Sequence, residues 1–344
     1  MEEEDSTATR YGGCACRRIP RPVGSAAALL LASLTWVLAT GPAGAEYPDR
    51  LIRLVVPQAP GSATDVLARI LAAELESQIG QSIVVENRPG GALTTGLSFT
   101  AKSASDGYTI AMGPIGALAI TRHLVKKLPY DIERDFQPIA LVTRGQMLLA
   151  VSRNLPVRTV EELVALAKAK PGVLVYASSS AGSPGHVGGE LFKFMTGTDI
   201  AHVPYRGGSM AIADLMSGQV HMMLESLSSI APFAQSGDVR ALAVSGPRRS
   251  PAFPDLPTID EAGVPGFEVT TWNGVIGPAG IPRPVVEKLN AAINAAMRTR
   301  GFEERLAALG QEVAGGTPED FAEAIRRDSA KWLDVIRRSG IKLD

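Results

Sequence analysis

Cysteine is almost absent from this chain of 344 residues, which contains two. Cys14 and Cys16 both precede the short apolar segment Ala26 to Ala39, and none follows it. If that segment is removed on export, the mature chain has no cysteine and therefore no disulfide. Its stability must then come from a packed core, which a chain of about 300 residues can supply.

A long hydrophobic run is also missing. The segment Ala26 to Ala39 is too short to span a bilayer comfortably. It follows basic residues (Arg17, Arg18 and Arg21) and precedes the small-residue triplet Ala43-Gly44-Ala45, which is the order of a cleaved export signal. We therefore predict a signal peptide over residues 1–45, cleavage after Ala45 and a soluble periplasmic protein.

Two features of this leader leave alternatives open. The acidic start Glu2 to Asp5 is atypical, and a start codon assigned too far upstream would explain it. The pair Arg17-Arg18 is compatible with twin-arginine export, but Pro20 and Arg21 fit that signal poorly. We expect ordinary secretion.

The chain has no surplus of charge of either sign, since its formal net charge is −1. Binding to nucleic acid or to an acidic membrane therefore has no electrostatic support. Apolar residues make up 45% and charged residues 20%, which is typical of a globular protein, and the length suits about two domains.

Catalytic signatures are absent as well. The sequence has no G-x-S-x-G, P-loop, G-x-G-x-x-G or H-E-x-x-H motif, and its four histidines lack metal-ligand spacing. We expect no catalytic residue, metal or cofactor.

What the sequence does contain is an alternation of strands and helices, which predicts an α/β protein. The predicted strands are Leu51 to Val56, Ile83 to Glu86, Tyr108 to Met112, Met147 to Val151, Leu174 to Ala177, His202 to Tyr205, Val220 to Leu224 and Val239 to Val244. The predicted helices are Thr64 to Ile79, Thr159 to Lys170, Val187 to Met195, Ser209 to Met216, Thr258 to Ala262, Pro282 to Arg298 and Pro318 to Arg338.

Two of these strands run into loops of small residues that feed a helix. One loop is Pro57 to Asp65 and the other is Ser178 to His186. A helix start offers unpaired N–H groups and a positive dipole end, and small residues let a ligand approach the backbone. Two such loops predict a pocket that holds a small anion from two sides.

The segments between and around these loops resemble the Bug family, the substrate-binding proteins of tripartite tricarboxylate transporters, over nearly all of Tyr47 to Leu343. The matching segments, in chain order, are Tyr47-Pro48, Ile52 to Pro57, Pro60-Gly61, Thr64-Asp65, Val85 to Gly90, Asp106 to Thr109, Leu128 to Asp131, Gly189 to Phe192, His202 to Tyr205, Leu256 to Thr258, Glu261 to Gly263 and Pro278 to Gly280.

The resemblance implies a type II periplasmic binding protein fold, in which two α/β lobes joined by two crossing segments close on a ligand. The first lobe would comprise residues 46–147 with 271–344, and the second residues 148–270. The family holds a ligand carboxylate through backbone N–H groups of the same two loops and through ordered waters. Partners would be a small organic acid or amino acid and, transiently, membrane transporter subunits. We expect a monomer.

The chain departs from the family pattern at four places. Gln58 replaces an aromatic residue, Ser62 and Ser180 replace glycines, and Glu225-Ser226 replaces Asp-Asn. These changes bear on the identity of the ligand and not on the fold. The candidate ligand-binding residues are Gln58, Pro60, Gly61, Ser62, Ala63, Asp65, Ser178, Ser179, Gly182, Ser183, Tyr205 and Glu225.

Several of these residues have an alternative reading. Asp65 has capping-box spacing from Ser62 and would cap the helix, or would bind a ligand ammonium. The serines of the second loop could be ordinary turn residues. Tyr205 could point its hydroxyl into the cleft or have it satisfied in the core, and Glu225 could face the cleft or lie on a charged surface.

Three functions follow from these features. The first is an exported solute-binding protein that delivers a small carboxylate to a membrane transporter. The second is a sensing module that presents its closed form to a membrane sensor. The third is an α/β hydrolase, which would need a Ser–His–acid arrangement that the residues around Ser183 and His186 do not supply.

Overall fold

The computed structural model describes residues 12–13 and 47–339. The cysteines, the apolar segment and the cleavage site of the predicted export signal lie outside the described residues. Within the described ranges, no helix combines the length and apolar character needed to cross a membrane.

The described chain alternates strands and helices, as predicted. The strands are β1 (Ile52–Val56), β2 (Ile83–Asn87), β3 (Thr109–Pro114), β4 (Phe136–Ser152), β5 (Val175–Ser178), β6 (Ala201–Pro204), β7 (Met222–Ser226), β8 (Val239–Val244), β9 (Thr270–Pro278) and β10 (Gln311–Val313). The helices are α2 (Ala63–Ile79), α3 (Thr94–Ala101), α4 (Thr121–Leu124), α5 (Val160–Ala169), α6 (Pro184–Thr196), α7 (Gly208–Ser217), α8 (Leu227–Gln235), α9 (Arg283–Met297), α10 (Arg300–Ala308) and α11 (Pro318–Ser339), with a short 3₁₀ helix η1 (Gly91–Leu93) and a short π-helix η2 (Gly116–Ile120).

The strands form two parallel groups joined by antiparallel strands, in the order β2-β1-β3-β9-β4-β7-β5-β6. β1 pairs in parallel with β2 and β3, and β5 pairs in parallel with β6 and β7. The long strand β4 pairs with β9 up to Gln146 and with β7 from Met147 onwards. β4 therefore runs from one group of strands into the other.

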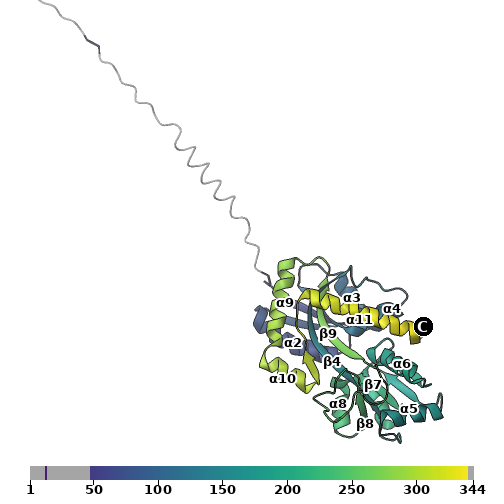
Figure 1. Cartoon of the computed structure of the whole chain (residues 1–344). Coiled ribbons are helices and arrows are strands. Elements are labelled where there is room, and N and C mark those ends of the chain that lie inside the picture. The colour runs from purple at the N-terminus through teal and green to yellow at the C-terminus, as the bar shows by residue number, and fades with distance from the viewer. Residues whose placement is uncertain (1–11, 14–46, 340–344) are drawn as a thin grey trace, which may run out of the picture. The chain divides into compact units, whose positions relative to one another are not determined.

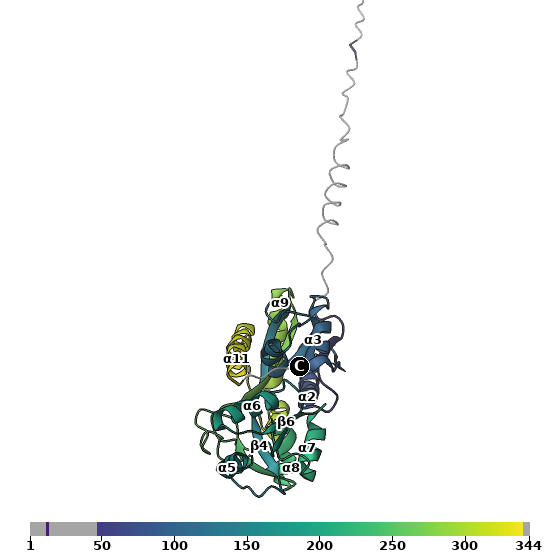
Figure 2. The ribbon, with the colours of Figure 1, turned by 90° about the vertical axis from the view of Figure 1, so that its right-hand side faces the viewer.

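This change of partner divides the fold into two lobes. We call the part with β1, β2, β3 and β10 the first lobe, and the part with β5 to β8 the second lobe. Elements from the two ends of the described chain, purple and yellow in Figure 1, gather in the first lobe, and the teal and green middle segment forms the second. Figure 2 shows α5 to α8 together in the second lobe, apart from α2, α3 and α9.

One apolar core lies within each lobe, and a third, which includes Val55 of β1 and Leu224 of β7, extends across both. The apolar face of α2, including Leu67 and Leu71, is fully buried and packs with α9 over the first sheet. In the second lobe, Leu215 and Ile230 of the covering helices pack on Met223 of β7. Trp272 is buried on β9 opposite Arg144 of β4.

The prediction of a helix over Thr258 to Ala262 is wrong, because this segment is a turn. The capping contacts of a helix start do form: Glu261 N–H donates to Thr258 Oγ1, and Thr258 N–H donates to the Glu261 carboxylate. Gly263 then adopts a left-handed conformation with φ 95°, and Pro265 follows, so no helix continues.

Candidate functional site

The carboxyl ends of the parallel strands lead directly into helix starts in both lobes. β1 is followed by α2 in the first lobe, and β5, β6 and β7 are followed by α6, α7 and α8 in the second. In open α/β sheets this edge is where ligands bind, because helix N-termini point their N–H groups and positive dipole ends there. Both predicted loops lie at this edge.

In the first loop, Ser62 caps α2 as predicted. Its hydroxyl accepts a hydrogen bond of 3.2 Å from Asp65 N–H, and the adjacent Gly61 has a left-handed φ of 78°. Pro60 and Gly61 are exposed, and Gln58, Ser62 and Ala63 are half-buried. The N–H groups at the start of α2 have no intrahelical acceptor, so this loop presents donors to a ligand.

The Asp65 carboxylate is fully used within the protein. Oδ2 accepts from Gly61 N–H at 2.8 Å, Oδ1 accepts from the Asn87 amide at 2.8 Å, and Arg69 pairs with both oxygens. Burial alone would raise the pKa of Asp65, but the hydrogen bonds from Arg69, Gly61 and Asn87 outweigh it and lower the pKa. These contacts match the capping alternative. Asn87 also donates to Gln58 O, so it stabilises the loop.

The second loop is built around buried hydroxyls and imidazoles. Ser183 caps α6 by accepting from His186 N–H at 3.3 Å, and His186 Nδ1 accepts from Gly182 N–H at 3.0 Å. Gly182 has a left-handed φ of 77°. Ser178 is fully buried. His186 therefore has a structural role in this loop.

Three stacked rings support this loop. The His186 and His202 rings lie 4.0 Å apart and nearly parallel, and Tyr176 stacks on His202 at 4.6 Å. Burial, with smaller contributions from His186 and Lys193, lowers the pKa of His202 to about 3, and burial also lowers the pKa of His186. Both imidazoles are therefore neutral near pH 7, and their stacking is not opposed by like charge.

Ser178 and His202 lie 2.7 Å apart, a distance that a Ser–His nucleophile would also show. The single hydroxyl proton of Ser178 is donated to Ser180 O, so His202 Nε2–H is the donor to Ser178 Oγ. A histidine in this role cannot take the serine proton as a general base. The pair holds the loop together and does not activate the serine.

Tyr205 and Ser179, two other predicted residues, differ in how their hydroxyl groups are placed. The Tyr205 hydroxyl donates to Asp214 Oδ2 at 2.6 Å, and burial together with this acceptor raises the pKa of Tyr205 to about 12. Its hydroxyl is therefore satisfied within the second lobe. Ser179 is half-buried at the loop tip, and its hydroxyl lies beside the carboxyl of Glu225.

Glu225, at the end of β7, is buried with 7% of its surface exposed, so the alternative of a charged surface position is wrong. Its Oε1 accepts from Ser226 N–H at 2.9 Å, whereas its Oε2 has no hydrogen-bond partner in the described chain. Burial raises the pKa of Glu225 to about 7, although Ser226 N–H and the nearby Ser179 hydroxyl favour the ionised form. Ser179 does not reach hydrogen-bond geometry with Oε2.

The end of β3 links the two loops. Thr64, in the first turn of α2, donates to Asn273 of β9 at 3.2 Å, and Asn273 pairs with Pro114 of β3. Two residues later, Gly116 lies so close to the second loop that an added Cβ would be 3.6 Å from Pro184 and 3.9 Å from Gly182 O. The two loops therefore border one region on either side of this strand end.

Sequence reasoning missed Gly116 and Asn273. A signal for Gly116 was present, because Gly113-Pro114-Ile115-Gly116 follows a predicted strand with small residues, as the two recognised loops do. Asn273 lies on a strand that was not predicted, so no pattern placed it near the first loop.

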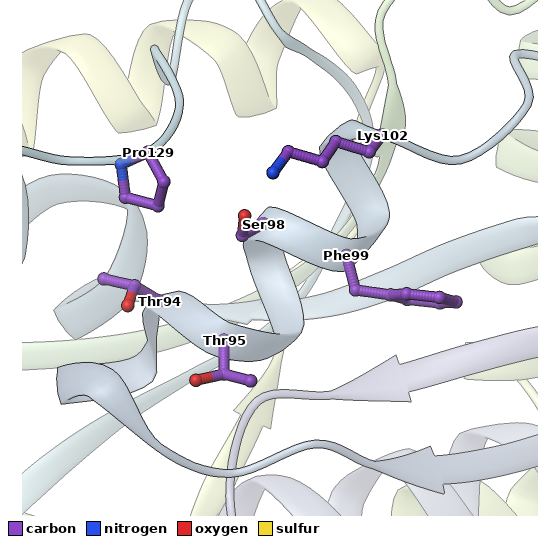
Figure 3. Close-up of a pocket in the computed structure, with 6 residues that line it drawn as sticks. All are labelled: Thr94, Thr95, Ser98, Phe99, Lys102 and Pro129. Carbon is purple, nitrogen blue, oxygen red and sulfur yellow. The ribbon is translucent and has the colours of Figure 1, made fainter.

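A separate hollow of about 380 Å³ is lined by Thr94, Thr95, Ser98, Phe99, Lys102 and Pro129. Figure 3 shows these side chains, most of them on α3. None of these residues belongs to either predicted loop, and none is a buried polar group aimed into the hollow. Within residues 12–13 and 47–339, no group of three or more His, Cys, Asp or Glu side chains is placed to hold a metal ion.

Comparison with known proteins identifies relatives along most of the chain. The sequence profile described as "Tripartite tricarboxylate transporter family receptor" matches residues 67–341. Protein BugT of Bordetella pertussis is 36% identical over 298 residues, covering 86% of this chain and 91% of BugT.

Solved structures of related proteins agree with these sequence matches. The structure described as "R. palustris Rpa4515 with adipate" is 38% identical, covers 86% of this chain and 99% of its own, and has a TM-score of 0.82. MatC (Rpa3494) from Rhodopseudomonas palustris with bound malate is 33% identical, covers 84% and 100%, and has a TM-score of 0.79. These proteins share the two-lobe fold. The chain belongs to the tripartite tricarboxylate transporter receptor family.

Proposed function

We propose that this protein is a periplasmic solute-binding protein that captures a small carboxylate between its two lobes and delivers it to the membrane subunits of a tripartite tricarboxylate transporter. The observation that supports this most directly is the convergence of helix starts from both lobes on one edge of the sheet. N–H groups of α2 on one side and of α6 on the other would share the ligand carboxylate.

The proposal includes the candidate residues of both loops as ligand-binding residues, with Gly61 to Ala63 and Ser179 best placed to reach a ligand. It also includes a first lobe of residues 46–147 with 271–344, a second lobe of residues 148–270, removal of residues 1–45 on export, and a monomeric protein. The change of partner of β4 at Met147 supports the lobe boundary.

Adipate and malate, the ligands named for two related structures, are reasonable first candidates. We infer that the protein is not an enzyme. The hydrolase alternative loses support because Ser183 caps a helix and Ser178 accepts from His202.

The test is native mass spectrometry of the exported protein, purified without denaturation, followed by a thermal-shift screen. The panel is acetate, succinate, malate, adipate, glutamate, benzoate and nicotinate. A retained acid or a clear shift for one compound, together with a smaller radius of gyration by X-ray scattering, is expected. If no acid is retained and no compound of the panel shifts the melting temperature, carboxylate capture is contradicted.

A further inference from the structure

Glu225 is an acidic side chain at a site whose other groups are hydrogen-bond donors suited to an anion. The candidate loops offer N–H groups and hydroxyls, and the Asp65 carboxylate is already paired with Arg69 and Asn87. Glu225 is instead a carboxyl at the same edge with one oxygen, Oε2, left without a partner in the described chain. A buried polar atom without a hydrogen bond costs free energy, so its presence calls for a role.

The carboxyl lies where ligand-binding elements meet. An added Cβ on Gly208, the first residue of α7, would be 3.5 Å from Oε2 and 3.9 Å from Oε1. Ser179 at the tip of the second loop lies beside the same carboxyl. Ser226 contacts Ser228, which in turn accepts from Gln311 of the first lobe at 3.3 Å. Glu225 thus lies between the tip of the second loop and the start of α7, and its neighbour Ser226 leads to the contact with Gln311.

The surroundings contain no cation that would keep Glu225 ionised. Burial is the main cause of its raised pKa, and no charged neighbour contributes. The neighbouring segments Met147 to Ser152 of β4 and Leu227 to Gln235 of α8 carry no titratable side chain. On the other elements around it, the titratable groups are Tyr176 on β5, His186, Glu190 and Lys193 on α6, His202 on β6, Tyr205 after β6 and Asp214 on α7; Lys193 is paired with Glu190 at 2.8 Å.

These neighbours do not supply a counter-charge. Both imidazoles are neutral, because burial lowers their pKa values, and Asp214 accepts from Tyr205. Arg206, before α7, is exposed and does not contribute to the shift of Glu225. A ligand carboxylate placed against an ionised Glu225 would therefore face an uncompensated like charge.

A proton between the two carboxyl groups removes this conflict. We propose that Glu225 is a ligand-contacting residue that binds as the carboxylic acid, donating a hydrogen bond from Oε2–H to a carboxylate oxygen of the ligand. The proton comes from solvent: ionised Glu225, one proton and the ligand carboxylate combine into a neutral acid hydrogen-bonded to the anion. This inference rests on the proposed function, and it makes carboxylate capture proton-linked.

The measurement is isothermal titration calorimetry of the exported protein with the tightest-binding acid of the panel above, in buffers of different ionisation enthalpy. With a free pKa of about 7, we expect uptake of about 0.9 protons per ligand at pH 8 and about 0.1 at pH 6. The Kd should rise about tenfold per pH unit above pH 8.

Glu225→Gln is the main variant, because its amide N–H can donate in place of the acid. We expect no proton uptake and an affinity that does not change between pH 6 and pH 8.5. Glu303→Gln, an exposed glutamate on α10, is the matched control and should leave the uptake unchanged. If Glu225→Gln fails to fold, Gly208→Ala serves instead: its Cβ, 3.5 Å from Oε2, should increase the burial of the carboxyl, raise its pKa further and move the uptake to higher pH.

The outcomes separate the two claims. Binding with equal proton uptake in the wild type and in Glu225→Gln, or with none in the wild type, would overturn the role of Glu225 and leave solute capture intact. Proton release on binding would also overturn it, because release indicates an ionised Glu225 that accepts from a ligand ammonium. No binding by any acid of the panel would remove the proposed function itself.

Discussion

Asp65 and Glu225 are both buried carboxyls, yet their surroundings shift their pKa values in opposite directions. Asp65 receives hydrogen bonds from Arg69, Gly61 and Asn87, which stabilise its charge and lower its pKa. Glu225 receives one backbone hydrogen bond on Oε1 and none on Oε2, so burial dominates and raises its pKa. The balance between burial and the number of donors around each group decides its protonation state.

For Glu225 the consequence is a loss of stability in alkaline solution. Its pKa rises from 4.5 in the unfolded chain to about 7 in the folded one, so its contribution is fully present below pH 4.5 and is lost as pH rises through 7. We predict that the free energy of unfolding falls by about 2–3 kcal/mol from this group between pH 4.5 and pH 8.5.

Urea unfolding of the ligand-free wild type and of Glu225→Gln at both pH values checks this. The wild type should lose stability relative to the variant, whose amide does not titrate. Parallel pH dependence in the two proteins would contradict the prediction.

For Asp65 the sign is opposite. Its lowered pKa means that its contribution is present above the unfolded pKa of 3.8 and is lost as pH falls through the folded pKa. Asp65→Asn places an NH₂ group among donors that need an acceptor, and we predict a loss of about 2 kcal/mol at pH 7.

Chemical denaturation compares the free energy of unfolding of Asp65→Asn with that of wild type. Asp334→Asn is the control, because Asp334 is an exposed partner of Arg338 on α11. The control should lose no more than about 0.5 kcal/mol. The deficit of Asp65→Asn should shrink below pH 3.8, and a deficit that is independent of pH would count against the charge-based explanation.

Among the elements, α6 is held against β5 by glycine. A Cβ on Gly189 would lie 2.3 Å from a ring carbon of Tyr176, the first of the three stacked rings under the second loop. Tyr176 is fully buried and its hydroxyl donates to Glu190 at 2.6 Å, so the ring has no room to move. The helix can approach this closely only because position 189 has no side chain.

Gly189→Ala should therefore destabilise the protein by about 2 kcal/mol through overpacking, even though alanine favours a helix. Gly301→Ala on α10 is the matched control, because its Cβ meets only the flexible ends of Glu74 and Arg305. Thermal unfolding should separate the two variants clearly. Equal melting temperatures would show that the ring stack yields without cost.

Close packing at glycines also explains why some elements could be predicted from the sequence and others could not. Helices with a regular apolar face, such as α2 and α9, and short apolar strands such as β1 and β8 were predicted within a few residues of their observed bounds. β9 was missed because Gly274 and Gly277 interrupt it, and glycine weakens a strand prediction. A Cβ at Gly274 would lie 2.2 Å from Phe321 of α11, so a tertiary contact requires this glycine.

The first half of β4 and helix α8 were missed for similar reasons. Pro138 and Gly145 disturb the strand pattern of β4, and Pro232 lies inside α8. These residues are tolerated because of tertiary packing, which no local sequence pattern indicates. β9 pairs with the first half of β4, and α8 buries Leu227 and Ile230.

For the molecule as a whole, the two loops could be predicted from the sequence, but their relation could not. The pattern of strand, small residues and helix start identified each loop by itself. That they border one region depends on Asn273 and Gly116, which lie about 209 and 52 residues from Thr64 along the chain. Strand order creates this proximity, and strand order is a long-range property of the chain.

Gly116 provides the test of that arrangement. It is buried at the start of η2 between Leu93 of the first lobe and Pro184 of the second loop, and an added Cβ would meet both at 3.4–3.6 Å. Alanine fits this space in ordinary contact, whereas leucine would push the end of β3 away from the second loop. We predict that Gly116→Ala binds a panel acid within about threefold of wild type, and that Gly116→Leu loses at least about tenfold in affinity.

X-ray scattering distinguishes a geometric cause from simple unfolding. Gly116→Leu should keep its helix content and a cooperative melting transition, but its radius of gyration should change less on ligand addition than that of wild type, because the lobes can no longer meet on the ligand. If Gly116→Leu closes fully and binds normally, the end of β3 does not set the distance between the loops, and the ligand must lie elsewhere along the sheet edge.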